Sequence, residues 1–415
     1  MNKEQNFDYP LSFLQRLANA TFFLLFPGFI IYHSLLAYGL VRPIAIGYIT
    51  VVATLFLVSA SLRLACQFIS DLFRRDPFFY TFLFFVCYIC TYAAFKYSTD
   101  PRPHIAVAAS QTFHMLGYAI FMFFLGRNIN LGHLLTSRIL LYWLLGFCIF
   151  LLIYCVIAHK LMFNAAVMAP GHIRQYVASY QAFSSAAAVV STMAVCSPVR
   201  FSQSICIYLI SGVVLFLLGT RSELIGFVIS GAVVIFLRGV SRDQAQFLIL
   251  FVTSLLGFAA ILLLFHVFDF SGFVQENRIF QLLDLSSSSS WAARNRFFDS
   301  GLGDILAHPF NGTFGGHVIT HGTTGSYIHN ALSAWANFGL LPFILYIALL
   351  VQPLLAILRK SFSASLTNQD LFIFAFGAEI VILAAVAKSV YWGIPPFYWG
   401  IYCATRHYRI GRLAA

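Results

Sequence analysis

Long apolar stretches separated by short polar connectors constrain this chain more than any other feature. A helix that spans a membrane needs about 20 mostly apolar residues, and the sequence contains about twelve such stretches. They are expected at residues 21–41, 44–66, 77–97, 105–125, 138–158, 177–197, 203–219, 223–239, 246–267, 329–357, 371–389 and 391–405. The sequence therefore predicts an all-α polytopic membrane protein, with residues 1–415 forming a single integral membrane domain.

The composition supports a membrane protein and indicates which partners its basic residues attract. Hydrophobic residues make up 60% of the chain and charged residues only 9%, whereas about 25% of a soluble domain is charged. If the N-terminus lies on the inner side, most of the 25 Lys and Arg residues fall at the inner membrane face. The net charge of +11 then attracts anionic head groups, so we expect membrane lipids and no nucleic acid as partners.

One long extramembrane segment, at about residues 268–328, interrupts the apolar pattern. Its composition changes to Gly, Ser, Thr, Asn, His and Arg. From Trp291 to Leu306 the apolar residues recur with helical spacing, and Pro309 and Gly312 end the pattern. We expect a short amphipathic helix that lies at the outer membrane surface.

Three arginines on the outer side are candidates for anion binding. Arg221 lies in the connector "GTRSE" between two apolar stretches, where it either binds an anion or anchors the helix by pairing with Glu223. Arg294 and Arg296 lie in the expected amphipathic helix and either cradle an anion or form a solvated face paired with nearby aspartates. Arginine suits a phosphate group because its planar fork donates two hydrogen bonds at once.

The histidines of the long loop allow two kinds of site. His317 and His321 have the i, i+4 spacing of zinc ligands on a helix, but "GGHVITHGTTG" is too rich in Gly and Thr to predict a helix, so we expect no metal site. His329 precedes an apolar stretch, and Asn330 can orient its ring or cap the helix. An imidazole there can act as a general base, or the histidine can be structural.

Two ionisable residues fall within or beside the penultimate apolar stretch. Glu379 and Lys388 are nine residues apart, which is off the spacing that lets helix neighbours touch. Either residue would therefore have to pair with another helix. A transporter would use such residues as a coupling pair.

The order of these features resembles the O-antigen ligase and polymerase superfamily of bacterial inner-membrane proteins. The similarity is carried by motifs within about residues 215–345, and the layout of spans around one long outer loop extends it to the whole chain. The positions that match are the "GTRSE" connector, Arg294, Pro309, Gly312, His329, Asn330 and Gly339. The second glycine of the motif is displaced to Gly315 and Gly316, and "GLGD" replaces an apolar helix turn.

The resemblance implies a glycosyltransferase of the periplasmic face that needs no metal and no other cofactor. Its donor would be a glycan linked to undecaprenyl diphosphate. Arg221 and Arg294 would bind the diphosphate with help from Arg296, and His329 would deprotonate or position the acceptor hydroxyl. Arg174, in the other outer loop, and Asn330 are further candidates.

The alternatives within the superfamily differ in the acceptor of the transferred glycan. A ligase transfers the glycan to lipid A-core, and we take this as the first interpretation. A polymerase of O-antigen or exopolysaccharide transfers it to a growing polysaccharide. A multispanning lipid or solute transporter is the alternative from another class, and it would distribute buried charges along the spans.

Overall fold

The computed structural model describes residues 11–100, 102–240, 289–322, 325–361 and 366–413. This part of the chain is helical and contains no strand, and eight of its helices are long and apolar enough to span a membrane. The predicted all-α polytopic membrane fold is confirmed. The expected stretch 246–267 lies outside the described residues, so the total of about twelve spans remains a prediction, as does the single domain.

The helices coincide with most of the expected apolar stretches. Those of the first half are α1 (Phe13–Phe23), the π-helical turn η1 (Leu24–Gly28), α2 (Phe29–Ala37), α3 (Tyr48–Arg74), α4 (Pro77–Thr99), α5 (Pro103–Asn128), α6 (Leu131–Thr136), α7 (Ile139–Ala158), α8 (Ala165–Met168) and the 3-10 turn η2 (Arg174–Tyr176). Those of the second half are α9 (Tyr180–Val195), α10 (Phe201–Leu217), α11 (Arg221–Val240), α14 (Ser289–Ala307), α15 (Gly316–His321), α16 (Leu332–Phe338), α17 (Leu340–Ser361), α18 (Asn368–Val386) and α19 (Ile394–Leu413). Helix α14 confirms the helix expected from Trp291 to Leu306.

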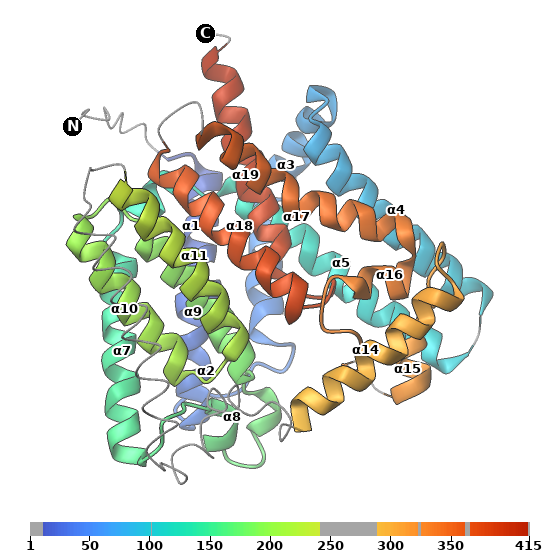
Figure 1. The fold of residues 1–415 in the computed structure, drawn as a ribbon, viewed down its shortest axis with the longest axis horizontal. Coiled ribbons are helices and arrows are strands. Elements are labelled where there is room, and N and C mark those ends of the chain that lie inside the picture. Colours follow the sequence, from blue (N-terminus) through green and yellow to red (C-terminus); the bar gives the residue numbers. More distant parts are fainter. Residues whose placement is uncertain (1–10, 101, 241–288, 323–324, 362–365, 414–415) are drawn as a thin grey trace.

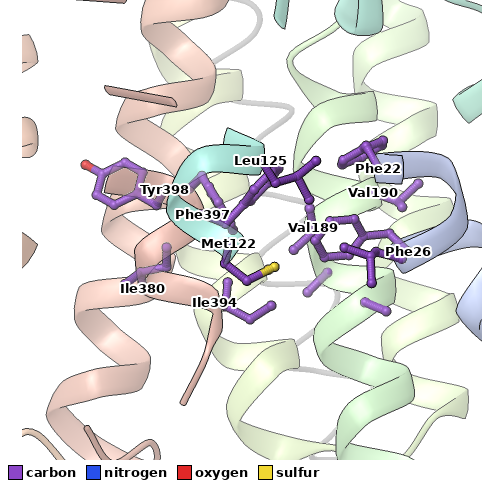
Figure 2. Packing of buried hydrophobic residues seen from close by; sticks show 14 of the residues in the cluster. Phe22, Phe26, Met122, Leu125, Val189, Val190, Ile380, Ile394, Phe397 and Tyr398 are labelled. Atoms are coloured by element: carbon purple, nitrogen blue, oxygen red, sulfur yellow. The ribbon is translucent and has the colours of Figure 1, made fainter. Parts of the chain in front are cut away.

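The core joins helices that are far apart in the sequence. Phe22 and Phe26 of the first span pack with Phe397 of α19, next to side chains of α5, α9 and α18 (Figure 2). The backbones of α5 and α19 are so close that a Cβ atom on Gly126 would lie 2.0 Å from the carbonyl oxygen of Phe397. Small residues allow this close van der Waals packing, on which membrane helices depend. The contact fixes the start of α19 and the loop before it, which carries Lys388.

Cations at one end of the bundle are held by fixed partners. Arg127 pairs with Asp71, and Arg406 lies 2.9 Å from Asp76. Arg238 donates to three backbone carbonyls at the end of α9. This is the end at which α19 finishes, whereas α8, α14 and α15 lie at the opposite end (Figure 1). The arginines of that opposite end include the candidates for anion binding.

The continuous helix expected over residues 329–357 is wrong, because the chain breaks at Gly339. Helix α16 ends before this residue and α17 begins after it. Gly339 has φ +89°, a conformation that glycine adopts without strain. The amide of Leu340 donates to the carbonyl of Phe310 at 3.3 Å, so the turn after α14 packs into the break. The apolar pattern runs through the break because it records burial and not backbone direction.

Replacing Gly339 with Ala is expected to destabilise the protein strongly. A Cβ atom there would lie 2.0 Å from the carbonyl oxygen of Phe310, on a backbone with positive φ. Strain of this kind costs about 1–3 kcal/mol before the clash is added. Thermal unfolding in detergent should therefore show a midpoint several degrees below that of the wild type. Gly117→Ala is the control, since its Cβ would meet nothing within 4 Å. Equal midpoints for the two variants would contradict the prediction.

Candidate active site

Two of the predicted arginines, Arg221 and Arg294, line the same pocket although 72 residues separate them in the chain. The pocket forms where the start of α9, the α10–α11 turn and the first turns of α14 meet. Its lining residues are Tyr180, Gln181, Gly219, Thr220, Arg221, Ser222, Trp291 and Arg294. We call this the arginine pocket. It contains no acidic side chain, so its formal charge is positive.

Local sequence places Arg221 at the start of a helix. Gly219 has φ +73°, which turns the chain sharply after α10. Leu224 donates its amide to the carbonyl of Thr220, and α11 begins at Arg221. The positive end of the helix dipole favours an anion at such a terminus. The connector "GTRSE" therefore supplies both a guanidinium and a helix N-terminus to the pocket.

Helix α14 separates the two arginines that the sequence placed side by side. Arg294 is half-buried and lines the arginine pocket, whereas Arg296 is exposed and does not line it. Residues two apart on a helix do not face each other, because each residue turns the chain by about 100°. The pair that meets is therefore Arg221 with Arg294, and not Arg294 with Arg296.

His329 lies close to Arg294 and is held in its neutral form. Its ring lies 5.3 Å from the ring of Tyr327 and 6.1 Å from that of Phe297 on α14, measured between centroids. Burial, followed by the positive charges of Arg294 and Lys388, lowers the pKa of His329 to about 4. The imidazole is therefore unprotonated at neutral pH and can accept a proton.

The neighbours of His329 fix its backbone. Ile328 is 3% exposed and packs with Ile305 of α14. Asn330 accepts a hydrogen bond at 3.0 Å from the amide of Leu332, the first residue of α16, whereas the N-cap position itself is Ala331. The amide of Ala331 donates to a carbonyl at the end of α18 at 2.6 Å. The histidine thus stands between α14, α16 and α18.

A buried ion pair connects the helix of Arg221 with the surroundings of His329. Lys388 lies 2.6 Å from Glu223, whose side chain is 1% exposed and also accepts hydrogen bonds from Ser185 and Ser222. Glu379 accepts instead from Thr192 of α9 at 2.8 Å. Lys388 therefore pairs with a residue of another helix and not with Glu379, as expected from the nine-residue spacing of Lys388 and Glu379. Sequence spacing gave no means of identifying Glu223 as that partner.

Arg174 lies outside the arginine pocket. It occupies the turn η2, is exposed, and donates to the carbonyl of Val167 at 3.3 Å. Tyr180, which begins the next helix, lines the pocket, whereas Arg174 is not among the lining residues.

The segment around His317 is helical, which corrects the expectation that its glycines and threonines prevent a helix. Gly315 and Gly322 have positive φ and bound the short helix α15 at its two ends. His317 is 6% exposed, with its ring nitrogens 3.0 Å from the Asn337 side chain and 3.3 Å from that of Gln111. Burial lowers the pKa of His317 to about 4. Packing onto α5 and α16 supplies the stability that local propensity lacks.

Among the residues that the structure describes, no three His, Cys, Asp or Glu side chains are grouped so that they could hold a metal ion. No family model matches the chain, and no curated protein matches it. The fold and the site define an all-α multi-pass membrane protein with a cationic pocket beside a neutral histidine.

Proposed function

We propose that the chain is a membrane glycosyltransferase of the O-antigen ligase type. It moves a glycan en bloc from undecaprenyl diphosphate to a sugar hydroxyl at the periplasmic face of the bacterial inner membrane. The observation that carries the proposal is the meeting of Arg221 and Arg294 in one pocket, next to the neutral His329. The chemistry requires neither a metal nor another cofactor, because the two guanidiniums supply the positive charge.

The arginine pocket supports the binding of a lipid diphosphate as the leaving group. The guanidiniums of Arg221 and Arg294 can each donate two hydrogen bonds to phosphate oxygens, and the positive end of the α11 dipole adds to their charge. Charge that develops on the diphosphate as it departs is thereby neutralised in advance. Such a leaving group needs no proton from an acidic side chain.

His329 supports activation of the acceptor. A neutral imidazole can take the proton of the acceptor hydroxyl while the oxygen forms a bond to the anomeric carbon of the donor sugar. The bond from that carbon to the diphosphate oxygen breaks, and its electron pair leaves with undecaprenyl diphosphate. The proton remains on His329 until water removes it. Burial, followed by the charges of Arg294 and Lys388, lowers the pKa of the ring and so favours this release of the proton.

Gene deletion in the host bacterium tests the function and identifies the acceptor. A lipopolysaccharide gel without O-chain, with long polymer still on the carrier lipid, is the result expected for a ligase. One repeat unit left on the core indicates a polymerase, and an unchanged gel with lost secreted polysaccharide indicates an exopolysaccharide enzyme. Unchanged lipopolysaccharide together with unchanged secreted polysaccharide would contradict the proposed function.

A further inference from the structure

The arginine pocket contains side chains that a diphosphate does not require. Two arginines and a helix start suffice to bind its charge, yet two aromatic rings and a carboxamide also line the pocket. These are Tyr180 and Gln181 from the start of α9 and Trp291 from the start of α14. They lie on two helices that line the pocket together with the α10–α11 turn.

Trp291 lies beside Arg294 in the arginine pocket. It precedes Arg294 by three residues on α14, a spacing that brings the two side chains onto one face of the helix. The tryptophan is 41% exposed, so its ring is available to a ligand. Gln181 donates to the hydroxyl of Tyr180 at 3.4 Å, which leaves its carbonyl oxygen as an acceptor for a ligand.

Thr220 provides an independent sign that the pocket takes a hydrogen-bonding ligand. The residue is 3% exposed, lines the pocket, and its hydroxyl has no hydrogen-bond partner among the described residues. A buried polar group without a partner costs about 1–3 kcal/mol. A ligand that pairs with the Thr220 hydroxyl would recover this free energy.

We infer that Trp291, with Tyr180 and Gln181, forms the binding site for the first sugar of the donor, the one bonded directly to the diphosphate. A pyranose ring has an apolar face of C–H groups and an edge of hydroxyls. The tryptophan ring packs against the apolar face, and the Gln181 amide with the hydroxyls of Tyr180 and Thr220 forms hydrogen bonds to the edge. The inference rests on the proposed function, since it assumes that Arg221 and Arg294 bind the diphosphate.

The arrangement orients the sugar for reaction. Arg294 lies one turn from Trp291 on α14 and is near enough to His329 for its charge to lower the pKa of that ring. A sugar held on Trp291 with its diphosphate on Arg294 therefore presents its anomeric carbon toward the space in which His329 activates the acceptor. Trp291, Tyr180 and Gln181 then determine which first sugars are accepted, because a site with placed hydrogen-bond partners rejects sugars that leave them unpaired.

Two lipids that differ only in the sugar test the inference. Purified full-length protein in detergent is titrated with undecaprenyl diphosphate and with the same lipid carrying one N-acetylglucosamine. Trp291→Ala should weaken binding of the sugar-bearing lipid by about three- to tenfold and leave the sugar-free lipid unchanged. Trp291→Phe should retain most of the affinity. Phe310→Ala, an aromatic residue that is 73% exposed and outside the pocket, is the matched control.

The remaining outcomes separate this inference from the proposed function. If Trp291→Ala weakens the binding of both lipids equally, the tryptophan contacts the lipid or the diphosphate, and the sugar site is overturned. Unchanged binding of both would overturn it as well. If the wild-type protein binds neither lipid, the proposed function fails and the sugar site fails with it. Arg294→Ala should weaken the binding of both lipids, because both carry the diphosphate that Arg294 is proposed to bind.

Discussion

Replacing His329 with Ala should lower the rate of glycan transfer by about 10²- to 10⁴-fold, the usual contribution of a general base. Donor binding should change little, because the arginine pocket does not include His329. The acceptor hydroxyl would then have to lose its proton to water, while Arg221 and Arg294 still hold the diphosphate. Transfer measured with saturating donor, together with donor affinity, distinguishes a lost base from a lost binding residue.

A second histidine of the same loop provides the control for this variant. His308 is exposed and lies after the end of α14, outside the arginine pocket. His308→Ala should therefore transfer glycan at the wild-type rate. Wild-type transfer by His329→Ala would rule out the base role and leave His329 as a structural residue.

The pH dependence of transfer follows from the same group. The neutral ring of His329 is the active form, and its pKa is about 4. The rate should therefore be insensitive to His329 protonation near neutral pH and should fall as the pH drops through the pKa. The charged groups that face the ring are Arg294 on α14 and Lys388 before α19. Removing either positive charge raises the pKa, so Lys388→Met should move the acid limb of the profile to higher pH.

Breaking the pair of Glu223 and Lys388 should give the second large effect, on stability. Their side chains are 1% and 12% exposed, so Lys388→Met leaves a buried carboxylate without its cation. Removing one partner of a buried pair costs about 3–5 kcal/mol, because the remaining charge stays desolvated. Thermal unfolding in detergent should show a clearly lower midpoint, and Glu223→Ala should show the same.

A double variant distinguishes the cost of a buried unpaired charge from the contribution of the ion pair to stability. Glu223→Gln combined with Lys388→Met leaves no unpaired charge, so its unfolding midpoint should return toward that of the wild type. If each single variant unfolds at the wild-type temperature, the pair does not connect α11 with the loop before α19. The double variant should also keep the shifted pH profile of Lys388→Met, because it lacks the same positive charge near His329.

The sequence predicted those parts of the molecule that depend on local pattern. Apolar runs located most of the helices, and the periodicity from Trp291 to Leu306 located α14. The sequence placed Arg221 in the connector "GTRSE" between two apolar stretches, and the structure makes it the first residue of α11. Arg221 and Arg294 were both candidates for anion binding before their common pocket was visible.

The remaining features depend on contacts between distant segments. The break at Gly339 exists because the turn after α14 packs into it, and α15 is helical because His317 is buried between α5 and α16. Spacing along one helix could not pair Lys388 with Glu223, 165 residues away. By residue type Arg296 was as suitable for an anion as Arg294, although only Arg294 matched the motif, and the packing of α14 places Arg294 in the pocket and leaves Arg296 exposed.

The binding of a lipid diphosphate tests the central claim most directly. Purified protein should bind undecaprenyl diphosphate more tightly than undecaprenyl monophosphate, and Arg221→Ala and Arg294→Ala should each weaken diphosphate binding by about 10- to 100-fold. Arg138→Ala is the control, since this exposed arginine directly precedes α7 and does not line the pocket. Equal affinity for the two lipids, or wild-type affinity in both pocket variants, would contradict the assignment of the arginine pocket to the donor diphosphate.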